Sequence, residues 1–254
     1  GAPKLVAELQ RRGVELFLVC DEGGAIISEP IGGIPGNFAM VGVFEKGKAD
    51  VKFTAKSTGG HASAPGRNTA LVRLAKLMCR VEKHYPFRAR FSPTLREMFR
   101  RMAPNMKFGM RLVLGNLWLF EPLLCFVLPR VNHMAGAMMR TTCAFTTAKG
   151  SDGLNVLPQE AYVTANMRCI PHQPTDESIA ILAKLAKKYG VEAEVIYQDA
   201  VPPVADYHAA PFKLLEETMA KVYPGYDVCP YIMTGGTDAR FYNQGTANEE
   251  PCNA

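Results

Sequence analysis

The order of hydrophobic periods between residues 49 and 198 is the feature that most limits how this chain can fold. Apolar residues alternate with others at 49–57, which predicts a strand, and recur at helical spacing over 68–85. Two further strands, a helix and a last strand are expected at 140–147, 160–170, 175–189 and 192–198. This succession, strand–helix–strand–strand–helix–strand, is that of a ferredoxin-like sandwich.

The segments on either side of this sandwich have the pattern of an α/β domain. Val14–Cys20 is a short, nearly continuous apolar run, as in buried parallel strands, and 37–44 predicts another strand. After the sandwich, a helix is expected at 209–222 and a strand at 228–233. We therefore predict an α/β fold in which residues 1–44 and 199–254 are parts of one domain, and residues 45–198 are inserted into it.

Within the inserted domain, residues 87–136 are too many for an ordinary loop. We expect two or three short helices here, because the apolar runs are interrupted by Pro93, Pro104, Pro122 and Pro129. Basic residues recur at helical spacing beside apolar ones, which favours a solvated helix face over a nucleic-acid site. They are Arg88, Arg90, Arg96, Arg100, Arg101, Lys107 and Arg111.

Leu112–Leu128 is the most hydrophobic stretch of the sequence. Gly115, Asn116, Glu121 and Pro122 interrupt it, so it is a poor candidate for a membrane span. It could still lie on a membrane surface or cover a pocket, although we do not expect contact with a membrane.

Composition and cysteine pattern indicate the number of domains and the redox state of the compartment. The 254 residues are 48% hydrophobic with a formal net charge of +5, enough for one or two domains with a sizeable core. The seven cysteines are scattered and none has C-x-x-C spacing, which argues against a thiolate zinc site. Several lie in apolar runs, as buried free thiols do. A reducing compartment, and hence the cytoplasm, is favoured over a disulfide framework.

A glycine-rich loop carries the most prominent candidate for chemistry. Gly59-Gly60-His61-Ala62-Ser63 follows a predicted strand and precedes a predicted helix, so the glycines can place the imidazole of His61 on an exposed tip. A neutral histidine there can donate to a developing oxyanion, and a charged one can bind a carboxylate. A loop histidine without any role fits the same pattern.

Other candidates stand at the ends of predicted elements. Asp21 follows the first apolar run, where a carboxylate can bind metal, cap the next turn or face solvent. Asn155 and Arg168 flank a predicted turn of the sandwich; Arg168 can grip a carboxylate or be an ordinary surface arginine. The run Thr234–Asp238 can bring N–H groups close to an anion or form a plain strand-to-helix turn. P-loop, nucleophile-elbow and dinucleotide motifs are absent from the sequence.

Taken in order, these motifs resemble one zinc metallopeptidase family. Asp-Glu-Gly-Gly from Asp21, the Gly-Gly-His-Ala-Ser loop, Asn155-Val156-Leu157-Pro158 with Arg168, and Gly-Gly-Thr-Asp-Ala-Arg from Gly235 follow its pattern. Members include carboxypeptidase S, aminoacylase, acetylornithine deacetylase and succinyl-diaminopimelate desuccinylase. The long excursion most resembles the carboxypeptidase S and N-acyl-amino-acid hydrolase branch. The resemblance covers about Leu5 to Gln244.

The resemblance implies a partial zinc-peptidase α/β domain with an inserted lid and dimerisation domain. Asp21 would be a zinc ligand at a two-zinc site, and His61 would stabilise the tetrahedral oxyanion, in relatives often across a dimer. Asn155 and Arg168 would hold the carboxylate of the substrate. The substrate would be an N-acyl amino acid or a peptide with a free carboxylate. The residues implied to line the pocket are Gly235, Gly236, Thr237 and Arg240.

The sequence also departs from the family. The His-x-Asp segment, a bridging aspartate and the Glu-Glu pair that should precede Gly1 are absent, and no histidine follows Gln244. One carboxylate cannot hold zinc tightly, since tetrahedral sites need three or four protein ligands. We therefore expect a fragment of an amide hydrolase that is inactive alone and binds zinc weakly or not at all. The alternative is a non-catalytic dimerisation or binding module.

Overall fold

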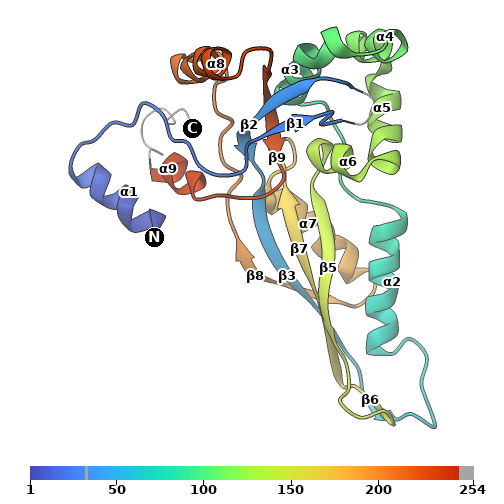
Figure 1. Ribbon diagram of the computed structural model, residues 1–254. Helices are drawn as coiled ribbons and strands as arrows, with labels where there is room; N and C mark the ends of the chain where they lie inside the picture. The colour runs from blue at the N-terminus through green and yellow to red at the C-terminus, as the bar shows by residue number, and fades with distance from the viewer. Residues whose placement is uncertain (32–33, 246–254) are drawn as a thin grey trace. The chain divides into compact units, whose positions relative to one another are not determined.

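The computed structural model describes residues 1–31 and 34–245, and Figure 1 shows their helices and strands. The chain divides into two compact units. Unit 1 comprises residues 1–46, 89–139 and the part from Pro202 onward, and unit 2 comprises residues 47–88 and 140–201. The predicted combination of an α/β domain with an inserted sandwich is confirmed.

Unit 2 is a four-stranded antiparallel sheet with two helices. Its sheet has the order β5-β7-β3-β8, in which the first strand of the unit is central and its last strand is at an edge. This is the strand order of a ferredoxin-like sandwich. The elements are β3 (Gly47–Lys56), α2 (Ala70–Lys83), β5 (Thr142–Lys149), β7 (Glu160–Cys169), α7 (Thr175–Lys187) and β8 (Glu192–Gln198).

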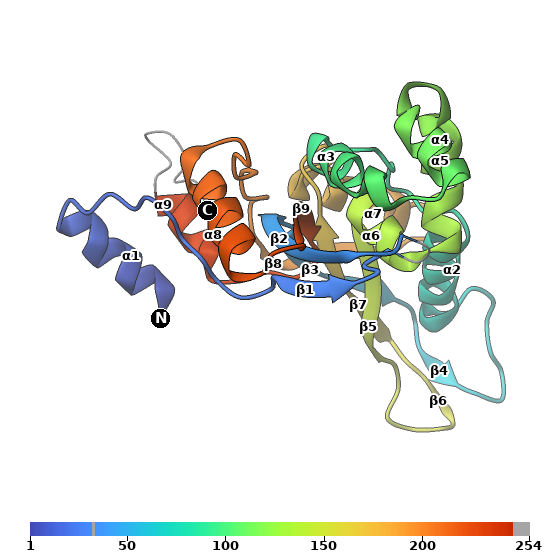
Figure 2. The same ribbon diagram turned by 45° about the horizontal axis from the view of Figure 1, so that its top comes forward.

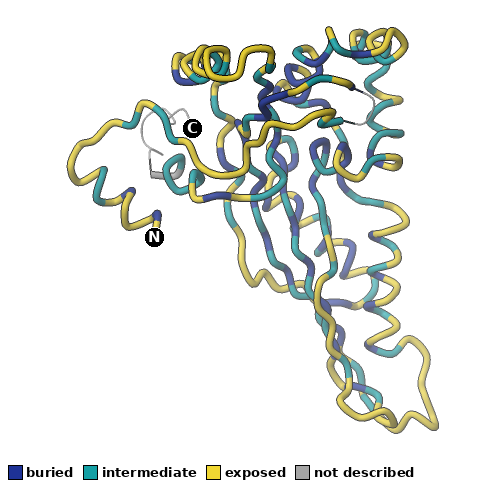
Figure 3. Tube along the Cα trace, in the orientation of Figure 1, coloured by how far each residue is buried: buried dark blue, intermediate teal, exposed yellow. Residues whose placement is uncertain are grey.

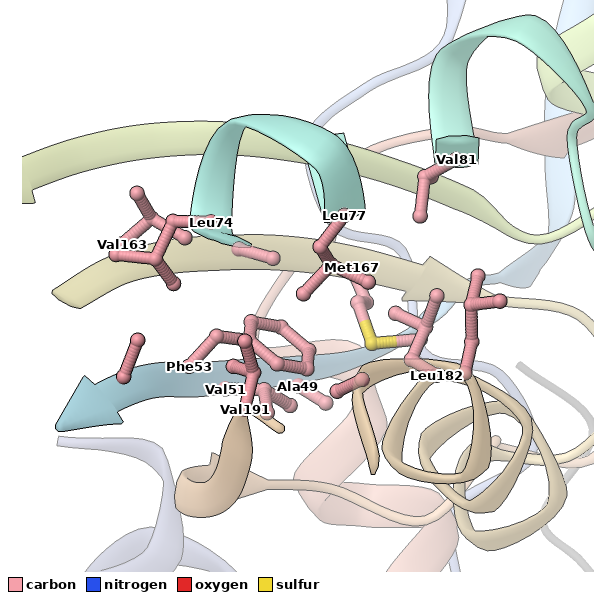
Figure 4. Close-up of a cluster of buried hydrophobic side chains, with 14 of the residues drawn as sticks. Ala49, Val51, Phe53, Leu74, Leu77, Val81, Val163, Met167, Leu182 and Val191 are labelled. Atoms are coloured by element: carbon pink, nitrogen blue, oxygen red, sulfur yellow. The ribbon is translucent and has the colours of Figure 1, made fainter. Parts of the chain in front are cut away.

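The core of unit 2 lies between this sheet and its helices. Every second residue of β3 is buried, because successive side chains of a strand point to opposite faces. Phe53 meets the buried stripe of α2, which includes Leu74 and Leu77, and α7 contributes Leu182 (Figure 4). Burying one such leucine contributes about 1.5–3 kcal/mol. The alternation in 49–57 and the helical spacing in 68–85 therefore specify one shared core.

Unit 1 contains a three-stranded sheet of order β1-β2-β9. β2 pairs with β1 in antiparallel orientation and with β9 in parallel orientation, so β2 and β9 end at the same edge. The short β1 strand, all of whose residues are exposed, was not predicted. The elements are α1 (Ala2–Arg11), β1 (Ala25–Ser28), β2 (Asn37–Glu45), α8 (Ala210–Val222), β9 (Asp227–Met233) and α9 (Ala239–Gly245).

The prediction of a buried strand at Val14–Cys20 was wrong. The segment forms no ladder with any strand in residues 1–31 and 34–245. Val14 is 45% exposed and Phe17 58% exposed, and the trace between α1 and β1 is largely exposed in Figure 3. A parallel strand needs a neighbour on its hydrogen-bonding side. Without a neighbouring strand, an apolar composition is not sufficient for this segment to form a strand.

The excursion is helical, as predicted, but it contains more helices than expected and belongs to unit 1. α3 packs against β9 because Leu95, Met98 and Met102 form a buried stripe on it. At the other end of the excursion, the buried Lys46 donates from Nζ to the carbonyl of Ala137, at 2.8 Å. The elements are α3 (Pro93–Met102), the 3-10 turn η1 (Ala103–Asn105), α4 (Phe108–Gly115), α5 (Leu117–Val131) and α6 (His133–Met139).

The predicted interruption of the apolar stretch lies at Asn116. α4 ends just before it, α5 begins just after it, and their axes are bent by 102°. Pro122 lies inside α5 rather than at a break. No single helix in the described part of the chain is long and apolar enough to cross a membrane.

Most of the predicted basic helix face is solvated, but Arg101 is largely buried and joins three elements of unit 1. It bonds to Glu97 on its own helix, to Glu216 of α8 and to the carbonyl of Val228 in β9. The Arg100 guanidinium and then that of Arg101 lower the pKa of Glu97 to about 2. Glu97 is therefore ionised in the folded protein at pH values where a free glutamate is protonated.

We expect Glu97→Gln to lower the free energy of unfolding at pH 7 by about 2 kcal/mol. Because the folded-state pKa is depressed, this stabilisation is present above the ordinary glutamate pKa of 4.5 and is lost as the pH falls toward about 2. Urea unfolding followed by circular dichroism at a series of pH values measures the difference.

Glu8→Gln is the matched control, because Glu8 also pairs with the arginines three and four residues later but on an exposed helix. It should shift the unfolding midpoint little. An equal effect of the two substitutions, or a Glu97→Gln effect that does not change with pH, would contradict this account.

Candidate functional site

His61 and Asn155 come together at one end of unit 2. β4 (Gly60–His61) pairs with β6 (Val156–Leu157), and the Ala62 N–H donates to the Asn155 carbonyl at 2.8 Å. Gly59 and Gly60 have φ values of +69° and +134°, which L side chains rarely adopt. The predicted need for glycines in this turn is therefore confirmed. Figure 1 shows this end, which we call the tip, beyond the main sheet of unit 2.

Hydrogen bonds at the tip orient the His61 ring. The Ser63 N–H donates to Nδ1 at 3.2 Å, and the Ser63 hydroxyl lies 2.8 Å from the same nitrogen. Since a backbone N–H can only donate, Nδ1 is an acceptor and the neutral ring carries its proton on Nε2. The side chain is exposed, so this Nε2–H can donate to a ligand. That is the requirement for an oxyanion donor.

Arg168 does not lie at the tip. It is the ninth residue of β7, which begins at Glu160 directly after the tip, so about 26 Å of strand separate the two. The expectation that Asn155 and Arg168 flank one turn was wrong for Arg168. Around it the sheet is charged: Lys48 pairs opposite Arg168 and bonds to Asp50 at 2.9 Å.

In unit 1, the loop after β9 binds the carboxylate of Glu45, a side chain of the same chain. The Thr237 N–H donates to Glu45 Oε2 at 2.8 Å, and the Thr237 hydroxyl bonds to Oε1 of the same carboxylate. Glu45 is the last residue of β2, and the parallel pairing with β9 brings it to this loop. The run Thr234–Asp238 thus brings an N–H group to a carboxylate of the protein itself, which fits both an anion-binding loop and a plain strand-to-helix turn.

Asp21 lies on the other side of the same loop. Its Oδ2 accepts from the Ala239 N–H at 2.9 Å, at the start of α9, and its Oδ1 accepts from the Glu22 N–H at 2.8 Å. The Glu22 N–H and then that of Ala239 hold the pKa of Asp21 below its usual range. Asp21 thus caps the first turn of α9 rather than a turn that follows it in sequence, and its carboxylate is ionised at neutral pH.

These residues border a pocket of about 360 Å³ within unit 1. Its volume is in the range of small-molecule sites, and most of its walls are apolar. Asp21, Glu45, Thr237 and Arg240 supply polar groups, whereas Gly235 and Gly236 are not among the residues that line it. The apolar walls include Leu18, Val41, Phe44, Phe212, Leu215 and Met219.

The metal ligands expected from the resemblance are not assembled here. Among the described residues, no three His, Cys, Asp or Glu side chains are grouped so that they could hold a metal ion. Both oxygens of Asp21 also accept backbone hydrogen bonds. A tetrahedral zinc site needs three or four protein ligands, so these residues do not fit a metal centre by themselves.

Glu45 is the site residue that sequence reasoning missed. It follows an apolar strand and precedes the buried Lys46, in a pattern that does not distinguish it from a surface glutamate at a strand end. Its position at the end of a predicted strand was the available signal, because parallel strands bring their carboxyl ends to one edge. Recognising it required the pairing of β2 with β9.

We expect Glu45→Gln to speed hydrogen exchange at the Thr237 amide by about 10- to 100-fold, since a bond to a charged acceptor contributes about 1.5–3 kcal/mol. Amide exchange followed by NMR measures it. Glu22→Gln is the control, because Glu22 is another carboxylate that lines the pocket, whereas the described hydrogen bonds from Thr237 to a glutamate go to Glu45. Unchanged exchange in Glu45→Gln, or equal acceleration in both variants, would show that Glu45 does not hold the loop.

Comparison with known proteins identifies the family. Residues 43–194 match the peptidase dimerisation domain of the M20 family. The N-fatty-acyl-amino acid synthase/hydrolase PM20D1 of Homo sapiens is 33% identical over 246 residues, covering 95% of this chain and 49% of that protein. The probable carboxypeptidase S-like 2 of Dictyostelium discoideum is 33% identical over 235 residues, covering 91% and 44%. The chain thus spans about half the length of the curated relatives it matches.

A solved structure supports the fold. The M20 family metallo-carboxypeptidase Sso-CP2 from Sulfolobus solfataricus superimposes with a TM-score of 0.56 at 15% sequence identity, over 98% of this chain and 66% of that one. At this identity the likeness concerns the fold alone. Together with the matched domain and the relatives, it confirms the resemblance found in the motifs. The chain belongs to the M20 metallopeptidase family, in the branch of the N-acyl-amino-acid hydrolases and carboxypeptidases.

Proposed function

We propose that this chain is part of a metal-dependent amide hydrolase that acts on N-acyl amino acids or on peptides with a free carboxylate. The observation that carries the proposal is the ring orientation of His61, which leaves an exposed Nε2–H as a donor. The names of the relatives, a fatty-acyl-amino acid synthase/hydrolase and a carboxypeptidase S-like protein, support this substrate class. A cytoplasmic location stays a prediction.

In this proposal His61 acts on the transition state. Hydrolysis of an amide places negative charge on the carbonyl oxygen in the tetrahedral intermediate, and the Nε2–H donates to that oxygen. Because Ser63 holds Nδ1 as an acceptor, the ring meets the substrate in the correct tautomer without reorganising. Asn155, joined to the same tip, would donate from its side-chain amide to the substrate.

Two copies of the chain are needed for the proposed site. The tip and Arg168 lie at opposite ends of β7, so they cannot contact one small substrate within one copy. In a homodimer the tip of one copy can reach a substrate that Arg168 of the other copy binds through its carboxylate. The matched dimerisation domain supports this assembly. A non-catalytic dimerisation module would use the same interface without turnover.

The pocket in unit 1, with Thr237 and Arg240 on its wall, is large and apolar enough to bind an acyl chain. We propose zinc as the metal and Asp21 as one of its ligands, the others coming from outside the described residues. Asp21 would then exchange its hydrogen bond with the Ala239 N–H for the metal. This chain alone should therefore bind zinc weakly, which isothermal titration calorimetry with zinc chloride measures; tight stoichiometric binding would contradict the assignment.

His61→Ala should lower kcat about 10²- to 10³-fold in an active, longer protein that contains this chain, with little change in KM, since the lost contact is to the oxyanion. Hydrolysis of N-acyl amino acids measures both constants. His172→Ala is the control, because that imidazole bonds to the Arg88 carbonyl in the body of unit 2. An unchanged kcat for His61→Ala would remove this residue from the mechanism.

Mixing two inactive variants tests the shared site. His61→Ala and Arg168→Ala dimers should each be nearly inactive, but after subunit exchange half of the dimers are mixed and each has one intact site. The mixture should recover about a quarter of wild-type activity. No recovery, with exchange verified by mass spectrometry, would mean that both residues serve a site within one copy or that one of them is not needed.

A further inference from the structure

The helices α4 and α5 carry an exposed apolar surface. On α5 the exposed residues recur three or four positions apart and so form one stripe, in which Leu119 is 56%, Leu123 58% and Phe126 60% exposed. Trp118 borders it with 80% exposure, and Phe108 at the start of α4 is also 80% exposed. Figure 2 shows the two helices packed together. We call these five residues the apolar stripe.

The charged residues of α4 and α5 and of the position before α4 are mostly basic. Lys107 and Arg111 lie at the first turn of α4, and Arg130 lies at the last turn of α5 with its guanidinium 3.7 Å from the ring centroid of Phe126. From Phe108 to Val131 the sequence has one acidic residue, Glu121, and its charge is matched by Arg96. The stripe thus combines large apolar side chains with exposed cationic groups.

We propose that this surface docks on an anionic lipid bilayer. Neither helix alone is long and apolar enough to cross it, and the pair is bent by 102° at Asn116, so we place both helices in its interface. The other four residues of the apolar stripe would enter the acyl boundary, while Trp118 sits at the headgroup level that tryptophan prefers. Lys107, Arg111 and Arg130 would contact the anionic headgroups. The structure thus gives a reason to revise the expectation that the protein avoids membranes.

The charges favour lipid over a second copy of the chain. A two-fold interface places the same patch on both sides, so the cationic residues of one copy would face those of the other without compensating acids. An anionic bilayer supplies the missing charge along the whole surface. The binding should accordingly weaken as salt is added.

Trp118 allows a test at the surface itself, because it is the one tryptophan of the chain. We expect its fluorescence to shift to the blue when the full chain is mixed with vesicles of phosphatidylcholine and phosphatidylserine, and brominated acyl chains to quench it. Vesicles of phosphatidylcholine alone, or a high salt concentration, should reduce binding. Lys107→Gln with Arg111→Gln should lower the partition coefficient by about 10- to 30-fold.

A triple variant distinguishes membrane binding through the apolar stripe from nonspecific binding through any exposed apolar side chain. Replacing Leu119, Leu123 and Phe126 by serine should abolish flotation with the vesicles, whereas the control, with serine at Leu5, Leu154 and Leu214, which are at least half exposed, should float like the wild type. Circular dichroism checks that each variant is folded. If the triple variant is unfolded, the loss of vesicle binding in Lys107→Gln with Arg111→Gln tests the proposal instead.

Three outcomes would overturn the proposal. The first is the absence of both flotation and a fluorescence shift with anionic vesicles. The second is equal binding to neutral vesicles that salt does not change. The third is a blue shift that rises with protein concentration without lipid, together with a dimer in sedimentation that the triple variant abolishes, because the apolar stripe would then be an interface between copies.

Discussion

The parallel ladder between β2 and β9 is the constraint on which unit 1 depends. It joins residues about 190 positions apart and brings the carboxyl ends of both strands to one edge, where Glu45 meets Thr237. From there Asp21 bonds to the first turn of α9, and the pocket lies between these groups and α8. The intervening sequence can be long because the entropy of closing a loop grows only with the logarithm of its length. An entire second unit can therefore occupy the connection between two paired strands.

Elements whose partners lie within the chain were predictable from sequence. In unit 2 the periods of β3, β7, α2 and α7 agree with the faces that they bury, and all four strands of the main sheet and both helices were found, although every residue of β8 is exposed. Val14–Cys20 failed because apolar composition does not provide a neighbouring strand. The excursion was recognised as helical, but its association with unit 1 depends on the buried stripe of α3 against β9, a long-range contact that local patterns do not encode.

The candidate site was predictable where a residue type is typical of one backbone conformation, as glycine is of positive φ values. The glycines before His61 need positive φ values, and this placed the imidazole correctly on a tip. Glu45 was missed because its role comes from a strand pairing rather than from a motif. Arg168 was placed beside the wrong end of its strand, since a motif fixes the order of residues along the chain and not the distance between them. Because of the distance between Arg168 and the tip, the proposed site has to be shared by two copies of the chain.

The long connection between β2 and β9 also has a consequence in time. A ribosome adds ~5–20 residues per second, so the 192 residues that are added after Glu45, up to and including Thr237, take about 10–40 s to synthesise. During that interval the apolar residues of β2 have no parallel partner, whereas unit 2 is complete once β8 has emerged. Unit 2 can thus fold before the β1-β2-β9 sheet, whose strands lie on both sides of it in the sequence. In a newly made chain, the apolar strand β2 therefore remains without its parallel partner, and prone to aggregation, until β9 has been synthesised.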